Sequence, residues 1–109
     1  MSNLTLTPVE RFLLAHLLYE YGGRLYFTTK RETPEETLAG FLAEDFVPME
    51  DRRYLKVKRA FTEALRKLKE NWMIELSGFE VALTIVGRTE AEKLSRERYE
   101  KLREKFGKT

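Results

Sequence analysis

The basic side chains between residues 51 and 70 are the groups in this sequence whose type and spacing could bind a ligand. This stretch carries eight Lys or Arg and three Asp or Glu, a net charge of +5, whereas residues 1–50 carry four basic and eight acidic residues, a net charge of −4. Solubility alone gives no reason to gather positive charge on one segment. Binding to phosphate groups does, so the sequence indicates a nucleic-acid partner.

A helical wheel divides this basic stretch into an inward stripe and an outward face. At 100° per residue, with Phe61 at the centre, the inward stripe consists of Tyr54, Val57, Ala64, Leu65, Leu68 and Trp72. Arg can pair with guanine through two hydrogen bonds, whereas Lys mainly contacts phosphates. An anion could also bind at the start of the preceding helix. The expected DNA contacts are Arg52, Arg53, Lys56, Lys58, Arg59, Lys30 and Arg31.

Catalytic and metal-binding groups are scarce in the rest of the sequence. The chain has no cysteine, which excludes disulfides and thiolate chemistry, and its single histidine, His16, has only Glu20 within helical reach as a second ligand. A buried His16 bonded to a carbonyl or carboxylate is the favoured interpretation. The acidic pairs Glu35-Glu36 and Glu44-Asp45 point apart on a helix. We therefore expect no enzyme activity, no cofactor and no metal site.

Length and composition are those of one soluble, highly charged domain. The chain has 109 residues, of which 42% are hydrophobic and 35% charged, and it contains no apolar run long enough to cross a bilayer. No signal peptide is evident at the N-terminus, so we expect a cytoplasmic protein. The absence of Gln, the presence of only two Asn and the many Glu, Lys and Arg residues suggest a thermophilic source.

Helix signals and apolar periodicity predict an α+β chain that is mostly helical. Capping boxes begin two helices at Thr7 and Thr33, and Gly22 ends the first of them. A short strand is expected at 24–29, the basic helix at 49–71, a strand pair at 72–76 and 80–86, and a last helix at 88–106. The first helix is apolar nearly all round, so we expect it to contact the core on one side and another helix or subunit on the other.

Two helices, the second of them basic, followed by a strand pair match a helix-turn-helix with a wing. Within that order, the stretch from Leu65 to Ile74 and the run Leu83-Thr84-Ile85-Val86-Gly87-Arg88 resemble the end of a winged-helix domain of the MarR, PadR and ArsR type. In those regulators Leu-Thr-x-x-Gly-Arg precedes a C-terminal helix. The resemblance implies a winged helix-turn-helix and a DNA-binding transcriptional regulator. Its third helix, about residues 50–71, would dock in the major groove of double-stranded DNA.

The chain departs from that family at two points. Asn71-Trp72 stands where the family usually has a glycine, and the wing turn Ser77-Gly78-Phe79 carries no Lys or Arg, with Glu75 and Glu80 on either side. Wings of the family often place a basic side chain in the minor groove. A winged helix that binds another protein in a larger assembly is therefore the alternative interpretation. The simplest alternative is a basic helix that is merely solvated.

The first and last helices offer apolar side chains for a second subunit. We divide the chain into a DNA-binding domain, residues 1–87, and a C-terminal dimerisation helix, residues 88–109. The expected homodimer contacts are Leu14, Leu18, Tyr21, Leu94, Leu102 and Phe106. If the two recognition helices lie about one DNA turn apart, the target is a palindrome. The alternative is that the last helix folds back on its own domain.

Overall fold

The described residues fold into five helices and a three-stranded sheet, which confirms an α+β chain that is mostly helical. The structure, a computed structural model, describes residues 5–29 and 31–107, with side chains up to residue 105. The elements are α1 (Pro8–Tyr21), β1 (Arg24–Tyr26), α2 (Pro34–Ala43), α3 (Tyr54–Glu70), β2 (Ile74–Leu76), β3 (Glu80–Leu83), α4 (Ile85–Glu92) and α5 (Arg96–Gly107). None of the helices in these residues is long and apolar enough to cross a membrane.

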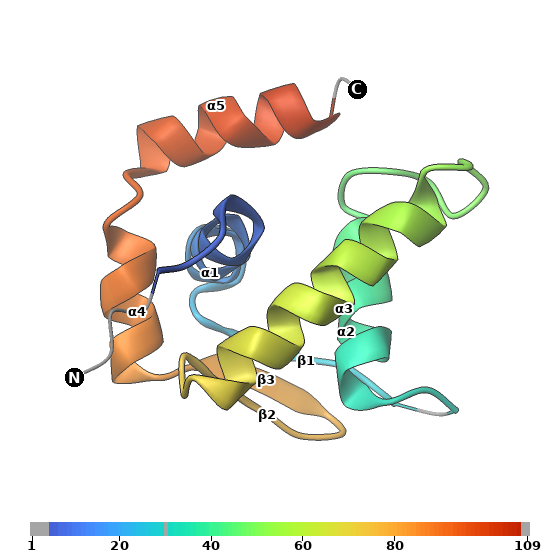
Figure 1. Ribbon diagram of the computed structural model, residues 1–109, viewed down its shortest axis with the longest axis horizontal. Helices are drawn as coiled ribbons and strands as arrows, with labels where there is room; N and C mark the ends of the chain where they lie inside the picture. The colour runs from blue at the N-terminus through green and yellow to red at the C-terminus, as the bar shows by residue number, and fades with distance from the viewer. Residues whose placement is uncertain (1–4, 30, 108–109) are drawn as a thin grey trace.

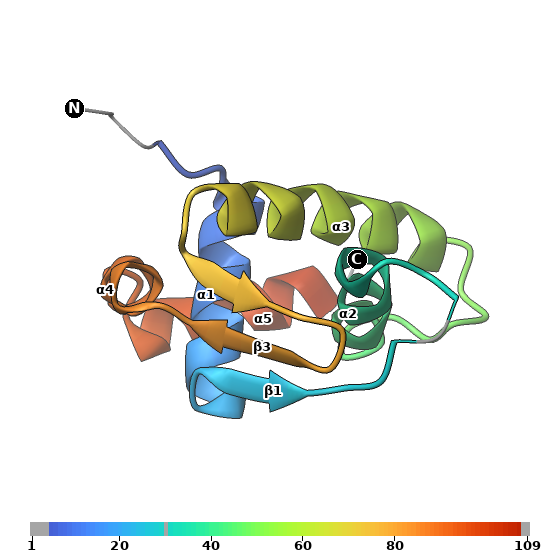
Figure 2. The ribbon, with the colours of Figure 1, turned by 90° about the horizontal axis from the view of Figure 1, so that it is seen from below.

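The sheet has the strand order β1-β3-β2, and both neighbouring pairs are antiparallel. Val81 in the middle strand pairs with Leu25 on one side and Leu76 on the other. The strand expected at 24–29 is shorter than predicted, although a backbone hydrogen bond of 3.0 Å from Phe27 to Phe79 continues its path beside the turn between β2 and β3. Figure 2 shows the strands side by side, with α3 along the β2 side of the sheet.

The helix-start signals in the sequence act as expected. The Thr7 hydroxyl accepts a hydrogen bond from the Glu10 N–H at 3.1 Å, and the Glu10 carboxylate accepts one from the Thr7 N–H at 3.0 Å. Thr33 and Glu36 repeat this exchange at the start of α2, at 3.1 Å in both directions. Gly22 ends α1 with a φ of 68°, a left-handed conformation that glycine adopts without strain.

Helix α1 is enclosed by its own chain. Figure 1 shows it nearly end-on between α3, α4 and α5. Leu14 is fully buried in the main core, and Phe12 packs with Leu94 and Tyr99 in a smaller cluster. The second side of α1 therefore contacts α4 and α5, as in the alternative of a C-terminal segment folded back on its own domain. Leu14 and Leu94, expected at a subunit interface, are instead buried inside the chain.

The C-terminal segment forms two helices where the sequence predicted one. Strand β3 ends before residue 86 because Thr84 caps α4, its hydroxyl accepting a hydrogen bond from the Gly87 N–H at 3.0 Å. A turn at residues 93–95 separates α4 from α5, and the Ser95 hydroxyl accepts a hydrogen bond from the Arg98 N–H at 3.2 Å. Both Thr84 and Ser95 are helix-capping residue types that the sequence analysis overlooked. The expected boundary after residue 87 falls inside α4.

Gly87 lies where α4 meets the start of the β2 segment. A methyl group at this position would sit 1.9 Å from the backbone oxygen of Met73, which no side chain can tolerate. The same Met73 oxygen accepts a hydrogen bond from the Thr84 hydroxyl at 3.1 Å. The Leu-Thr-x-x-Gly-Arg run therefore combines a strand end, a helix cap and a contact too close for any residue but glycine.

Helix α3 begins later and ends earlier than the sequence indicated. It starts at Tyr54 because residue 51 forms a turn: the Asp51 carboxylate accepts a hydrogen bond from the Arg53 N–H at 2.7 Å. The helix ends at Glu70, and Trp72 has a φ of 59°, so a wheel drawn through the helix does not apply to it. The Trp72 side chain is 75% exposed, and its predicted place in the core stripe is wrong.

Candidate nucleic-acid interface

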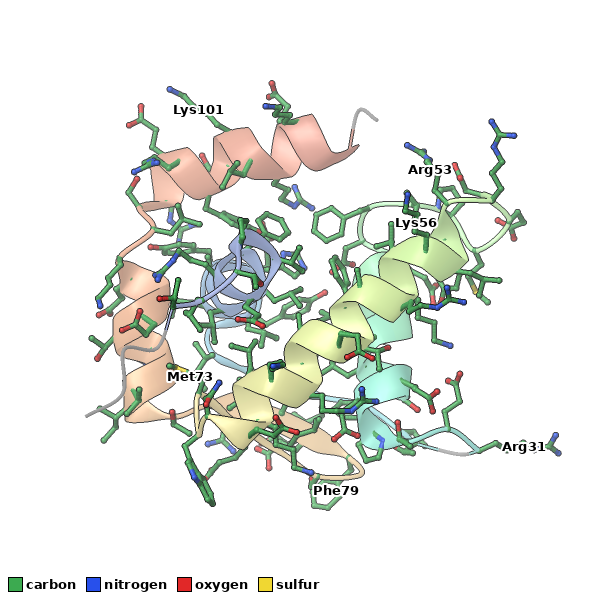
Figure 3. All side chains as sticks on the ribbon, in the orientation of Figure 1. Arg31, Arg53, Lys56, Met73, Phe79 and Lys101 are labelled. Carbon is green, nitrogen blue, oxygen red and sulfur yellow. The ribbon has the colours of Figure 1, made fainter. Side chains whose placement is uncertain are left out.

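The outer face of α3 consists of the exposed residues on the side away from the core. Phe61, Leu65 and Leu68 are fully buried and mark the inward side of the helix, as the wheel predicted. The outer face comprises Leu55, Lys56, Arg59, Glu63, Arg66 and Lys67. Figure 3 shows Lys56, together with Arg53 just before the helix, projecting outward at the N-terminal end of α3. One end of an exposed helix face thus carries a group of cations.

Three cations on or just before the first turns of α3 make no ion pair within the described part of the chain. Arg52 lies in the turn before α3, and Lys56 and Arg59 lie on its first two turns. All three residues are exposed. A cation without an acidic partner can neutralise a phosphate without first losing an ion pair. Arg52, Lys56 and Arg59 are therefore the predicted contacts best placed to meet an anion.

Arg53 and Lys58, by contrast, are held by acidic side chains. The Arg53 guanidinium donates to both carboxylate oxygens of Asp51, at 3.1 and 2.9 Å, and holds the pKa of Asp51 at about 2. The Lys58 ammonium lies 2.5 Å from the Glu32 carboxylate, and this hydrogen bond raises the pKa of Lys58. Both cations would have to exchange a carboxylate for a phosphate to bind DNA.

Positive charge is concentrated at the N-terminal end of α3. Residues 52–61 carry five basic and no acidic side chains, whereas residues 62–70 carry three basic and two acidic ones. In the second group Arg66 donates to Glu63 at 2.9 Å, and Lys69 pairs with Glu35 of α2 at 3.6 Å. The N-terminal end of the helix is therefore the part that would attract a polyanion.

The start of α2 does not form the free anion site that the sequence suggested. The Glu36 carboxylate accepts hydrogen bonds from the N–H and the hydroxyl of Thr33, at 3.1 Å each, and these bonds lower the pKa of Glu36. A carboxylate thus already occupies the positive end of the helix. Arg31 is exposed and projects from the loop before α2 (Figure 3), next to the Glu32 that pairs with α3. Lys30 lies outside the described residues.

The turn between β2 and β3 presents an aromatic side chain instead of a cation. Phe79 is 64% exposed and projects outward (Figure 3). Glu80, which follows it, pairs with Arg24 of β1, and Glu75 on β2 is exposed. No residue of the hairpin from 74 to 83 can therefore place a positive charge in a minor groove.

A group of polar side chains around a buried histidine, here called the His16 cluster, links α1, α5 and the turn after α2. His16 is 1% exposed, and its Nε2 and Nδ1 lie 2.8 Å from Asp45 Oδ2 and 2.5 Å from the Tyr99 hydroxyl. The Tyr21 hydroxyl donates to Asp45 at 2.7 Å, and the Tyr99 hydroxyl donates to Glu20 at 3.0 Å. The prediction of a buried histidine bonded to a carboxylate is confirmed. Asp45 and Tyr99 are distant in sequence from His16, and nothing local marked them as its partners.

The electrostatics of the His16 cluster are those of a structural contact. Burial alone would raise the pKa of Asp45, but hydrogen bonds from His16 and Tyr21 outweigh it, so the pKa of Asp45 is lowered. Burial and the hydrogen bond to Glu20 raise the pKa of Tyr99, whose hydroxyl therefore stays protonated. Within the described residues, no group of three or more acidic, His or Cys side chains could hold a metal ion. The cluster fixes α5 against α1.

The remaining residues expected at a dimer interface are divided between the core and the surface. Leu18 and Tyr21 are partly buried against the core of their own chain, and Leu102 on α5 is exposed. The side chain of Phe106 lies outside the described residues. No protein-family model, curated protein or solved structure matches the chain.

Proposed function

We propose that the protein binds double-stranded DNA as a transcriptional regulator, with the N-terminal half of α3 docked in the major groove. The observation that supports this proposal most directly is the group of exposed cations at that end, Arg52, Lys56 and Arg59, which make no ion pair within 4.0 Å among the described residues. The N-terminal residues of a recognition helix are the ones that reach base edges in helix-turn-helix docking.

The packing of α2 against α3 also supports a helix-turn-helix. The Tyr54 hydroxyl donates to the backbone oxygen of Gly40 at 3.3 Å, and a side chain at Gly40 would meet that hydroxyl at 2.8 Å. Such a close crossing holds α3 in one orientation on α2. The element order, with β2 and β3 following α3 directly, is the one expected for a winged helix-turn-helix.

We also propose that the protein acts as a homodimer. The apolar surface of α1 no longer suggests a second subunit, since α4 and α5 cover it. Leu102 is the exposed apolar side chain on the described part of α5. Two copies of α3 about one DNA turn apart would read a palindrome.

Fluorescence anisotropy with random duplex DNA across a salt series tests the DNA contact. We expect micromolar or tighter binding whose affinity falls steeply with salt. The double variant Arg52→Ala/Lys56→Ala should reduce the salt slope by about 2, because each phosphate contact contributes about 1. Its unfolding free energy should stay within about 0.5 kcal/mol of the wild type, since both side chains are exposed.

The matched control removes two exposed lysines from another helix. Lys101 and Lys105 lie on α5, and Figure 3 shows Lys101 projecting from it. Lys101→Ala/Lys105→Ala removes the same net charge and should leave the slope unchanged. Equal losses in both double variants would mean that charge alone, and not the face of α3, determines binding. An absence of binding at low salt would refute the proposal.

A protein-interaction module is the second candidate, and the wing favours it. Tyr26 and Phe79 are each 64% exposed at the same end of the sheet, where Tyr26 pairs with Glu80 in the register of β1 and β3. A protein partner could cover these rings. Tyr26→Ser/Phe79→Ser would then abolish an assembly that the α3 variant leaves intact, and size-exclusion chromatography of the co-purified complex would show it.

A further inference from the structure

We propose that the outer face of α3 reads bases as well as phosphates, with Leu55 against a thymine methyl group, Arg59 on a guanine and Glu63 on a cytosine. This inference rests on the proposed function. Leu55, Arg59 and Glu63 are spaced four residues apart and follow one line along the exposed side of the helix. Eight residues of helix rise about 12 Å, which is close to the length of three to four base pairs.

Leu55 interrupts a face that is otherwise charged. Its side chain is 67% exposed, and it borders a shallow groove of about 400 Å³ on the α2 side of the helix, together with Arg59, Thr62 and Glu63. A single exposed leucine is ordinary on a protein surface. One turn before Arg59 on a helix that enters the major groove, it meets the thymine C5 methyl, which is the apolar group that base pairs present there.

Glu63 is the second residue that a surface for phosphates alone would not contain. Its side chain is 66% exposed and it accepts a hydrogen bond from Arg66 at 2.9 Å. A carboxylate near phosphates is repelled, whereas a carboxylate facing the bases can accept a hydrogen bond from the cytosine N4 amino group. Arg66 then holds Glu63 in place, and its positive charge reduces the repulsion between Glu63 and the nearby phosphates of the DNA.

Arg59 lies between the two and provides the strongest base contact. Its exposed guanidinium has no ion pair among the described residues, so both of its parallel donors are free for the O6 and N7 acceptors of guanine. Lys56 and Lys67, which lie on the other flank of the outer face, are placed for the phosphates beside the groove. The outer face thus has a central line of three residues that contact different bases, and lysines on one flank that contact phosphates.

The test begins with the duplex sequence that the wild-type protein selects from a random pool. Each thymine of that sequence is then replaced by deoxyuridine, which removes only the C5 methyl group. We expect one position at which this replacement weakens wild-type binding about fourfold, the value of one buried methyl group. At that position Leu55→Ala should bind thymine and uracil equally, both at the weakened affinity. Ile85→Ala, which shortens an exposed side chain on α4, should keep the wild-type discrimination.

A second variant addresses the cytosine contact. Glu63→Gln should lower the preference for cytosine over thymine at one position about tenfold, while Glu70→Gln, on the last turn of α3, should leave that preference intact. A uniform rise in affinity for every sequence would instead mean that Glu63 only repels phosphates, and would overturn its role as a reader.

The outcomes separate this inference from the function on which it depends. Salt-dependent binding without any selected sequence, or a selected sequence in which no thymine responds to the loss of its methyl group, overturns base reading and leaves DNA binding in place. If Leu55→Ala loses the same affinity for the duplex with thymine as for the duplex with deoxyuridine at that position, base reading by Leu55 is also overturned. An absence of DNA binding at low salt overturns both proposals together.

Discussion

The outer face of α3 and the contact of α5 with α1 are both rich in polar side chains, but they use them in opposite ways. In the His16 cluster, Asp45 and Tyr99 satisfy both ring nitrogens of a fully buried histidine. On the outer face, Lys56 and Arg59 are exposed and have no ion pair among the described residues. Buried polar groups that are fully bonded define one packing arrangement, whereas exposed and unpaired ones remain available to a partner. Stability and binding are therefore expected to depend on separate residues.

The largest predicted effect tests how firmly the C-terminal helices are held. Gly87→Ala should lower the unfolding free energy by about 3 kcal/mol, because the new methyl group would overlap a backbone oxygen that cannot rotate away. Gly78→Ala is the control, since nothing lies within 4 Å of a methyl group there, and it should change stability by less than about 0.5 kcal/mol. Urea unfolding followed by circular dichroism measures both. Equal urea midpoints for Gly87→Ala and Gly78→Ala would contradict the close contact between α4 and Met73.

A smaller loss is expected from the His16 cluster itself. Tyr99→Phe removes the hydroxyl that contacts both His16 and Glu20, and leaving the buried His16 ring nitrogen unsatisfied should cost about 1–3 kcal/mol. Tyr26→Phe alters an exposed hydroxyl and should be nearly neutral. DNA affinity measured where Tyr99→Phe is fully folded should match the wild type. A large loss of affinity would show that the two regions are not independent.

The smallest effect concerns pH. The folded-state pKa of Asp45 is lowered, so its contribution to stability is present above about pH 4 and is lost as the pH falls through the folded pKa. The stability difference between wild type and Asp45→Asn should therefore shrink between pH 6 and pH 3. Glu92→Gln is the control and should show little change in stability over the same range, because the Glu92 side chain is exposed and makes no ion pair within the described residues. If the stability difference between wild type and Asp45→Asn did not change with pH, this result would argue against a hydrogen-bonded Asp45 carboxylate.

Signals confined to a few neighbouring residues predicted the structure well. The capping boxes at Thr7 and Thr33 and the glycine at Gly22 set the helix ends where the sequence placed them. The 3.6-residue period of α3 identified its buried and exposed sides correctly. Errors occurred where a local competitor was overlooked: Asp51 delays the start of α3, and Thr84 begins a helix inside a stretch that reads as a strand.

The other features that the sequence did not predict depend on contacts between residues that are far apart in the chain. The pair between Lys58 and Glu32 engages the ammonium group of one expected DNA contact, and these residues are 26 positions apart. The covering of α1 by α4 and α5 depends on contacts such as that of Arg11 with Glu90, separated by 79 positions. Apolar residues on every side of α1 indicated that something must cover it, but periodicity cannot distinguish a second subunit from a later part of the same chain.

The enclosure of α1 has a consequence for synthesis on the ribosome. His16 emerges early, but its partner Tyr99 follows 83 residues later, and until then one apolar side of α1 has no cover. A nascent chain that has not yet released α5 therefore presents a long hydrophobic helix surface to chaperones and to other nascent chains. Native packing of α1 is thus completed only after residues near Tyr99 have left the ribosome, when the slow closure of this large loop brings α5 into place.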